Sequence, residues 1–203
     1  MSYSNFRRTL LATIVLGLLG TAPALAQNQW FSLSYGVALP SGPTQDFTDN
    51  TSWRNIGADY SWFTSRHIAV GFSAAWNVFV EREADVTTSL SGSDITGTQI
   101  RYVNAFPLLV TGRYFLKGRN SGDFDLWLGA GAGAMISENR VDVGIFTVDE
   151  SPWHLSVAPE AGVVYPVNDV MALFAQGKYT FGFKTDDIEH RYFNINLGFA
   201  WRN

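Results

Sequence analysis

His154 and Ser156 are the residues with the most evident catalytic chemistry in this 203-residue chain. A histidine can accept the proton of a serine hydroxyl, and an activated hydroxyl attacks acyl groups. Because one residue separates them, both side chains would lie on the same face of a β-strand. Two polar residues near a strand end are also common without any catalytic role. The pair is therefore either a catalytic base and nucleophile or two ordinary polar residues.

A second group of polar residues recurs at alternating positions and shares one face of the predicted strands. Its members are Asp59, Arg101, Arg113, Asp125, Glu160, Gln176 and Lys178. An enzyme gathers such groups around a substrate, and a pore lines its wall with them. In a narrow enclosed interior they must instead be paired, because an isolated buried charge is costly. The elements that hold them decide between these possibilities.

The segment Gly129-Ala130-Gly131-Ala132-Gly133 superficially resembles a phosphate-binding loop. It lacks both the glycine spacing of a dinucleotide-binding turn and the lysine of a P-loop. Small residues that relieve crowding inside a narrow β-barrel explain it better.

Apolar and polar residues alternate through the end of the chain. Phe193, Ile195, Leu197, Phe199 and Trp201 occupy one face of the predicted terminal strand, opposite Tyr192, Asn194, Asn196, Gly198 and Ala200. A strand with an apolar, aromatic face and a small or amide-bearing face is typical of a transmembrane β-barrel, because its outer surface meets an apolar solvent and its interior is polar.

The same alternation predicts seven further strands. They lie near residues 31–39, 55–62, 68–80, 100–114, 126–136, 155–165 and 173–181. The fold class is therefore all-β, an eight-stranded antiparallel up-and-down transmembrane β-barrel. Such a barrel has an interior just wide enough for side chains, so a network of ion pairs is favoured over a pore or an active site. We expect Glu160 near Gln176 and Lys178, Arg113 near Asp125 and Trp127, and a bulge or local distortion at Pro107.

Long and short connections alternate between these strands. The segments 82–97, 138–152 and 184–190 are predicted as long loops, and carboxylates concentrate in the long connections: Asp46, Asp49, Glu83, Asp85, Asp94, Glu138, Asp142, Asp149, Glu150, Asp186, Asp187 and Glu189. These acids either bind divalent cations or a cationic partner, or they only solvate the loops. No loop has the ligand spacing of a calcium motif, and we expect no resident metal or other cofactor.

Aromatic residues collect at both predicted ends of the strands, as in the two interfacial girdles of a membrane barrel. The turn-side set is Trp30, Trp62, Phe63, Phe115, Phe124, Tyr165 and Trp201, and the loop-side set is Trp53, Tyr102, Trp153, Phe183 and Tyr192.

The N-terminal 26 residues have the pattern of a secretory signal peptide. Arg7 and Arg8 precede the apolar run 10–19, and Ala24-Leu25-Ala26 is a small-x-small cleavage site. We therefore predict a cleaved signal peptide at 1–26 and a barrel at 27–203. Loss of the two arginines changes the net charge from −4 to −6, which gives a nucleic-acid partner no electrostatic support. The chain has no cysteine, so it has neither a disulfide nor a thiolate site.

The mature sequence resembles the small outer-membrane β-barrel families of Gram-negative bacteria, such as the transmembrane domain of outer membrane protein A and the opacity-type barrels. The resemblance lies in the segments 165–169 and 177–181 and in the ending 194–201. It implies an integral outer-membrane protein that is inserted by the barrel-assembly machinery. The assembly signal would include Gly198, Phe199 and Trp201, although Arg202 and Asn203 follow the aromatic residue that usually ends such chains.

A second resemblance concerns activity. Outer-membrane lipid A deacylases are barrels of this size with a His-x-Ser pair, but their motif continues Ser-Asn and lies on the penultimate strand, whereas Val157 follows Ser156 here. We therefore expect a non-enzymatic monomer that contacts outer-membrane lipid and lipopolysaccharide and serves envelope integrity or surface interaction. A lipid A-modifying enzyme and a narrow channel are the alternatives.

Overall fold

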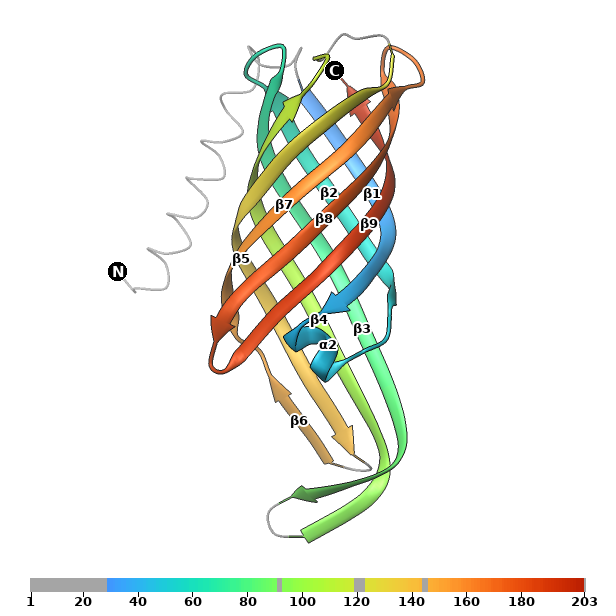
Figure 1. The fold of residues 1–203 in the computed structure, drawn as a ribbon, viewed down its shortest axis with the longest axis vertical. Helices are drawn as coiled ribbons and strands as arrows, with labels where there is room; N and C mark the ends of the chain where they lie inside the picture. The colour runs from blue at the N-terminus through green and yellow to red at the C-terminus, as the bar shows by residue number, and fades with distance from the viewer. Residues whose placement is uncertain (1–28, 91–92, 119–122, 144–145, 203) are drawn as a thin grey trace, which may run out of the picture.

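The computed structural model describes residues 29–90, 93–118, 123–143 and 146–202, which form strands and one short helix (Figure 1). In chain order these are β1 (Gln29–Ser41), α2 (Pro43–Phe47), β2 (Ser52–Phe63), β3 (Ile68–Leu90), β4 (Ser93–Phe115), β5 (Asp125–Val143), β6 (Phe146–Glu150), β7 (Trp153–Pro166), β8 (Met171–Thr185) and β9 (Ile188–Arg202). The predicted signal peptide lies outside the described residues. No helix among the described residues is long and apolar enough to span a membrane.

Eight of the strands close into an antiparallel barrel, which confirms the predicted fold class. The sheet runs in the order β4-β3-β2-β1-β9-β8-β7-β5, and pairing between β4 and β5 closes it. The first and last strands are neighbours, since β1 pairs with β9 from Trp30↔Arg202 to Ser41↔Arg191. The short strand β6 stands outside the cylinder and pairs only with β5.

The two ends of the barrel differ. Short turns join β2 to β3, β4 to β5 and β7 to β8 at the end where β9 also finishes, which we call the turn end. The opposite end, the loop end, carries α2, the β3–β4 and β5–β6 hairpins and the β8–β9 turn (Figure 1). The hairpins extend well past the rim of the cylinder, as Figure 1 shows.

The alternation of side chains is as predicted. Residues assigned to the outer face are exposed and apolar, among them Leu33, Phe72, Leu128, Leu155, Leu173, Leu197 and Phe199. Residues assigned to the inner face are buried, including Ser34, Asp59, Arg113, Glu160, Lys178 and Asn196. The exposed apolar residues form a band around the barrel, which we call the apolar belt. An apolar outer surface around a polar interior is the distribution that an apolar solvent requires.

The prediction of the aromatic girdles is partly wrong. Trp30, Phe63 and Phe115 do not belong to an outer girdle but pack edge-on or tilted inside the barrel at the turn end, with ring centroids 5.0–5.3 Å apart. Tyr192 is likewise fully buried at the loop end. Each occupies an inward position of its strand, so the strand register overrides the preference of an aromatic ring for an interface.

Two predicted long loops are strands instead. Residues 82–97 continue the β3–β4 ladder, which runs to Leu90↔Ser93 with one irregularity between Glu83 and Val86. In the region 138–152, β5 continues to Val143 and β6 folds back on it through Asn139↔Glu150. Polar composition predicted loops because these ladders lie beyond the apolar belt, where outward residues need not be apolar.

The predicted loop 184–190 is also wrong, because β8 and β9 meet in a two-residue turn. Asp186 and Asp187 both have positive φ, at 48° and 66°. This is the backbone of a type I′ hairpin turn, which matches the twist of the flanking strands and which Asp tolerates better than most residues. Pro107 causes no bulge, since the β3–β4 register is the same at Ala74↔Leu108 and at Asn77↔Ala105. The ladder is interrupted between these two pairs, so the distortion at Pro107 is a local loss of pairing with β3.

Helix α2 closes part of the loop end, a feature that the sequence did not predict. Thr44 and Thr48 are fully buried, and Phe47 packs against an interior cluster that contains Phe79, Met135 and Tyr192. The Thr44 Oγ1 accepts a hydrogen bond from the Arg191 N–H at 2.8 Å, which ties the helix to the start of β9.

Candidate functional site

The centre of the barrel holds two cations and two carboxylates in mutual contact, which we call the central charge cluster: Asp59, Arg113, Glu160 and Lys178. Arg113 of β4 bridges both acids, through Nε to Glu160 Oε1 at 2.7 Å and through Nη2 to Asp59 Oδ1 at 2.6 Å. A guanidinium suits this task because its fixed fork of donors meets two acceptors at once. The cluster carries no net charge, as a closed interior demands.

Lys178 completes the cluster from β8. Its Nζ lies 3.1 Å from Glu160 Oε2 and 3.9 Å from Asp59 Oδ1, and it donates to Ser73 Oγ at 2.9 Å. The register explains the contact with Glu160, since Glu160 and Lys178 are direct partners across β7 and β8. Gln176, one inward position away, donates to Glu160 Oε2 at 2.5 Å.

Trp127 supports the cluster on its turn-end side. The Arg113 guanidinium carbon lies 4.8 Å from the centroid of the Trp127 ring, a cation–π distance. The ring fits because position 162 on the neighbouring strand is glycine: a Cβ there would come within 2.5 Å of the Trp127 side chain. The structure thus brings Arg113 to Trp127.

Two residues assigned to the interior network lie elsewhere. Asp125 sits at the turn end, where its carboxylate accepts hydrogen bonds from the backbone N–H groups of Lys117 (2.7 Å) and Gly118 (2.9 Å). Arg101 sits at the loop end, where it donates to Gln99 Oε1 at 3.0 Å and lies 3.7 Å from Glu83. Spacing along a strand gives the face of a residue but not its distance from residues on other strands.

Sequence reasoning missed Ser61 and Ser73 as partners of the cluster. Ser61 Oγ accepts from Arg113 Nη1 at 3.3 Å, and Ser73 accepts from Lys178. Their inward positions on β2 and β3 were the available signal. An inward hydroxyl beside Arg113 or Lys178 can accept a hydrogen bond from an N–H group that does not bind a carboxylate.

The arrangement of His154 differs from a pair with Ser156. The His154 Nε2 lies 2.8 Å from Ser137 Oγ on β5, and Nδ1 lies 2.9 Å from the Phe183 carbonyl oxygen. The Ser156 hydroxyl has no hydrogen-bond partner among the described residues. The imidazole of His154 therefore contacts the hydroxyl of Ser137, and the group that orients the imidazole is the Phe183 carbonyl and not a carboxylate. Ser137 has no exposed surface, so a substrate cannot reach its hydroxyl in this arrangement.

The interior beside these groups contains little space. Two cavities border the central charge cluster, one toward Asn77 and Asn194 and one toward Trp30 and Phe174, with volumes of about 10 Å³ each. A cavity of this size holds about one water molecule. Asn194 donates to Asn77 at 2.6 Å and Asn55 donates to Asn196 at 2.6 Å, so the polar interior continues from the cluster toward the loop end as an amide network.

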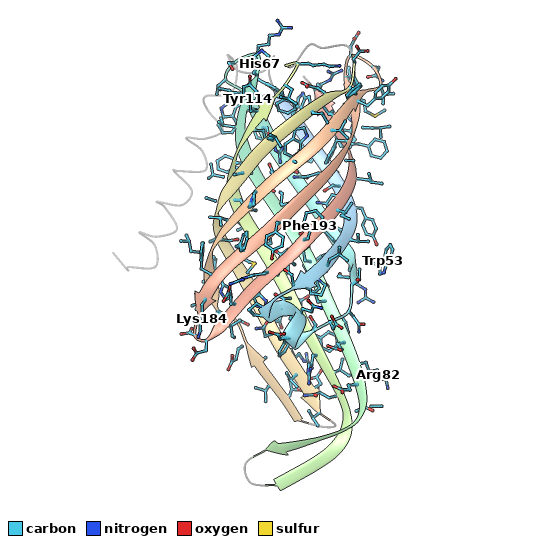
Figure 2. The ribbon with its side chains drawn as sticks, viewed as in Figure 1. Trp53, His67, Arg82, Tyr114, Lys184 and Phe193 are labelled. Carbon is cyan, nitrogen blue, oxygen red and sulfur yellow. The ribbon has the colours of Figure 1, made fainter. Side chains whose placement is uncertain are left out.

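The β5–β6 hairpin at the loop end carries charge on its outer face. On β5, Arg140 donates to Asp142 Oδ1 at 2.9 Å, and this hydrogen bond, with one from Thr147, holds the pKa of Asp142 below its usual value. Figure 2 shows Arg82 on β3 near the loop end and Lys184 near the end of β8, where Lys184 pairs with Asp187 of the β8–β9 turn at 2.7 Å. Among the described residues no three His, Asp or Glu side chains come together as a metal site would require.

The residues of the predicted assembly signal lie on β9 near the turn end. Phe199 and Trp201 point outward and are partly exposed, and Trp201 stacks on Phe31 of β1 with a centroid distance of 5.9 Å. Gly198 points inward beneath Phe174, where a Cβ would meet the Leu33 carbonyl oxygen at 2.3 Å.

Comparisons with known proteins give the fold. No protein-family model matches the chain, and no curated protein matches it in sequence. Solved structures do match. Neisserial surface protein A aligns with a TM-score of 0.52 at 14% identity, over 86% of this chain and 96% of that one.

Two further solved structures give the same result. The attachment invasion locus protein Ail of Yersinia pestis, in complex with the heparin analogue sucrose octasulfate, aligns with a TM-score of 0.51 at 17% identity, over 87% of this chain and 99% of that one. The N-terminal β-barrel domain of Pseudomonas aeruginosa OprF aligns with a TM-score of 0.51 at 10% identity, over 87% and 98%. The chain has the fold of the small eight-stranded outer-membrane barrels.

Proposed function

We propose that this protein is a monomeric, integral outer-membrane barrel that presents the β3–β4 and β5–β6 hairpins at the cell surface and has no enzymatic activity. The observation that carries the proposal is the asymmetry of the barrel. An apolar belt surrounds a sealed interior, and strand ladders project from the loop end only. A rigid barrel that holds variable hairpins away from the membrane is a frame for surface interaction.

The interior argues against the channel alternative. The ion pairs of the central charge cluster connect β2, β4, β7 and β8 across the interior, and the two neighbouring cavities each have room for about one water molecule. Transport of a solute would require these pairs to separate in a medium of low dielectric constant, which is costly. We therefore place the function on the outer surfaces and not in the lumen.

Cysteine labelling tests the orientation. The chain has no cysteine of its own, so single cysteines at Thr147 on β6 and at Asp169 in the β7–β8 turn can be labelled without background. We expect Thr147→Cys to react with a membrane-impermeant maleimide in intact cells and Asp169→Cys to react only after permeabilisation. The opposite result would place the hairpins on the periplasmic side and overturn the proposal.

Deletion of a hairpin tests the role. Removal of residues 86–97 shortens β3 and β4 beyond the barrel and leaves the cylinder intact. We expect the shortened protein to fold but not to correct the envelope or surface-binding defects of a deletion strain. The partner differs from the sulfated ligand of Ail, because the loop end here is rich in carboxylates, such as Glu138, Asp149 and Glu150. Equal rescue by the full and shortened chains would refute the role of the hairpins.

The enzymatic alternative has a direct test at the pair that the structure shows. Lipid A from cells that express the wild-type chain should have the same mass as lipid A from cells that express Ser137→Ala. A loss of an acyl chain that depends on Ser137 and His154 would replace our proposal with a lipid A-modifying activity.

A further inference from the structure

The loop end contains a cleft outside the barrel interior. It has a volume of about 340 Å³ and lies between the inward face of the β5–β6 hairpin on one side and α2 with the β8–β9 turn on the other. Its hairpin wall includes Asn139, Val141, Val148 and Glu150, and its opposite wall includes Phe47, Ile188 and His190. A pocket of this size suits a small ligand or one large side chain.

Two residues that line this cleft each have a buried polar atom without a hydrogen-bond partner among the described residues. The atoms are Asn139 Oδ1 and His190 Nε2, and His190 is 2% exposed. The other ring nitrogen of His190 is held by Thr44 Oγ1 at 3.3 Å, so the ring is fixed with Nε2 left over. Buried polar groups in proteins are almost always paired, so an unpaired polar atom in a residue that lines a cleft needs an explanation. A small side-chain movement that admits a ligand group to this atom would supply one.

The charge of the cleft gives the sign of the ligand. Glu189 is paired with Arg191, and Asp187 is paired with Lys184. Glu150 forms no ion pair or hydrogen bond with any described residue, and it lies directly opposite Asn139 in the β5–β6 register, on the same face. A carboxylate and an amide oxygen side by side form an acceptor pair that suits an N–H-rich cation.

The apolar walls define the rest of the ligand. Phe47, Val141, Val148 and Ile188 line the cleft, and they can cover a hydrocarbon stem while the charged head meets Glu150. We propose that the cleft binds a primary ammonium or guanidinium group carried on a short apolar stem. A free aliphatic amine and the lysine or arginine side chain of a peptide share this chemistry.

This site is separate from the proposed display function. A protein that fails to reach the cell surface would still bind the cation when purified, and a surface-exposed barrel could lack the site. The two proposals can therefore fail independently.

Calorimetric titration of the purified, folded chain in zwitterionic detergent tests the inference. The probes are n-butylamine, its neutral isostere n-butanol, and a capped tripeptide with a central lysine. We expect saturable binding of at least one cationic probe and none of butanol. Butylamine binding would show that a free amine is sufficient, and binding of the tripeptide alone would identify the source as a peptide side chain.

Variants locate the site. Glu150→Gln should weaken binding at least about tenfold, the loss expected for one charge-assisted hydrogen bond. Asp149→Asn is the matched control, because it removes a carboxylate from the adjacent position of β6, on the opposite face, and it should leave binding unchanged. Val148→Trp should block the cleft without removing a polar group. Heat-dependent gel mobility reports that each variant is folded.

Three results would overturn the inference. They are equal binding of butanol and butylamine, equal loss in Glu150→Gln and Asp149→Asn, and absence of binding by both cationic probes to the wild-type chain at millimolar concentration.

Discussion

Removal of the Lys178 ammonium gives the sharpest test of the central charge cluster. The Lys178→Met variant keeps most of the side-chain volume and deletes one charge. Two carboxylates then share the single cation Arg113, and the buried cluster acquires a net charge of −1. We expect this variant to lower the free energy of unfolding.

The geometry sets the size of the effect. At an effective dielectric constant of about 20, two unit charges 3.1 Å apart, the distance from Lys178 Nζ to Glu160, attract by about 5 kcal/mol. Desolvation of the ammonium cancels part of this attraction, and loss of one partner of a buried pair costs about 3 to 5 kcal/mol. Glu160 keeps hydrogen bonds from Arg113 and Gln176, so we expect the lower part of that range.

A double variant separates lost charge balance from lost packing. In Glu160→Gln with Lys178→Met the remaining pair, Arg113 with Asp59, is neutral again. The double variant should regain about 1 to 3 kcal/mol relative to Lys178→Met, because no charge is left uncompensated. Lys184→Met, which breaks an exposed pair with Asp187, is the control and should cause no resolvable change.

The assay is equilibrium unfolding in lipid vesicles, followed by tryptophan fluorescence during a denaturant titration. The reasoning is refuted if Lys178→Met is as stable as wild type, or if the destabilisations of the two single variants simply add in the double variant. Additive effects would mean that the two side chains do not interact.

Three further predictions concern the wall, the packing and a turn. Ile195→Arg places a charge on the outer belt, level with Gly177 beside Lys178, and should destabilise by about 2 to 4 kcal/mol near the bilayer midplane, whereas Ile195→Met should be neutral in the same titration. Gly162→Val should displace the Trp127 ring and change its near-UV circular dichroism; an unchanged spectrum would contradict the packing described. Exchange of Asp186-Asp187 for Asn-Gly should raise thermal stability slightly, because that pair favours the type I′ turn, and a lower midpoint would exclude this turn type.

The barrel could be predicted because its solvent imposes a strict rule on every strand. Inside the apolar belt, each outward residue must be apolar and each inward residue must fit a narrow interior, so a period of two fixes both the strand and its facing. Gly129, Gly131 and Gly133 illustrate this on β5, where they lie inward in a strand and not in a phosphate loop. The direct pairing of Glu160 with Lys178 follows from the same rule together with a short turn at residues 166–169.

The hairpins and α2 could not be predicted because the rule ends with the belt. Beyond it an outward residue need not be apolar. Thr87, Ser89 and Asp94 have the composition of a loop, although their backbone continues the β3–β4 ladder. Helix α2 has five residues, too few for a helical period, and its burial depends on contacts with β9 that are distant in sequence. Neither Ser137 nor Asn139 stands out locally, since their neighbours come from β7 and β6.

The order of layers inside the barrel explains why the available chemistry lies at the loop end. An aromatic layer around Trp30 and Phe115 fills the turn end, and a second apolar layer around Phe79 and Tyr192, covered by Phe47 of α2, fills the loop end. The charge cluster lies between them and is buried, so its ion pairs are strong but its groups cannot reach a substrate. Polar groups that a ligand can reach must therefore lie beyond the second layer, as the exposed Glu150 does. The cleft between α2 and the β5–β6 hairpin borders this second layer on its outer side, because Phe47 packs against the second apolar layer and also lines the cleft.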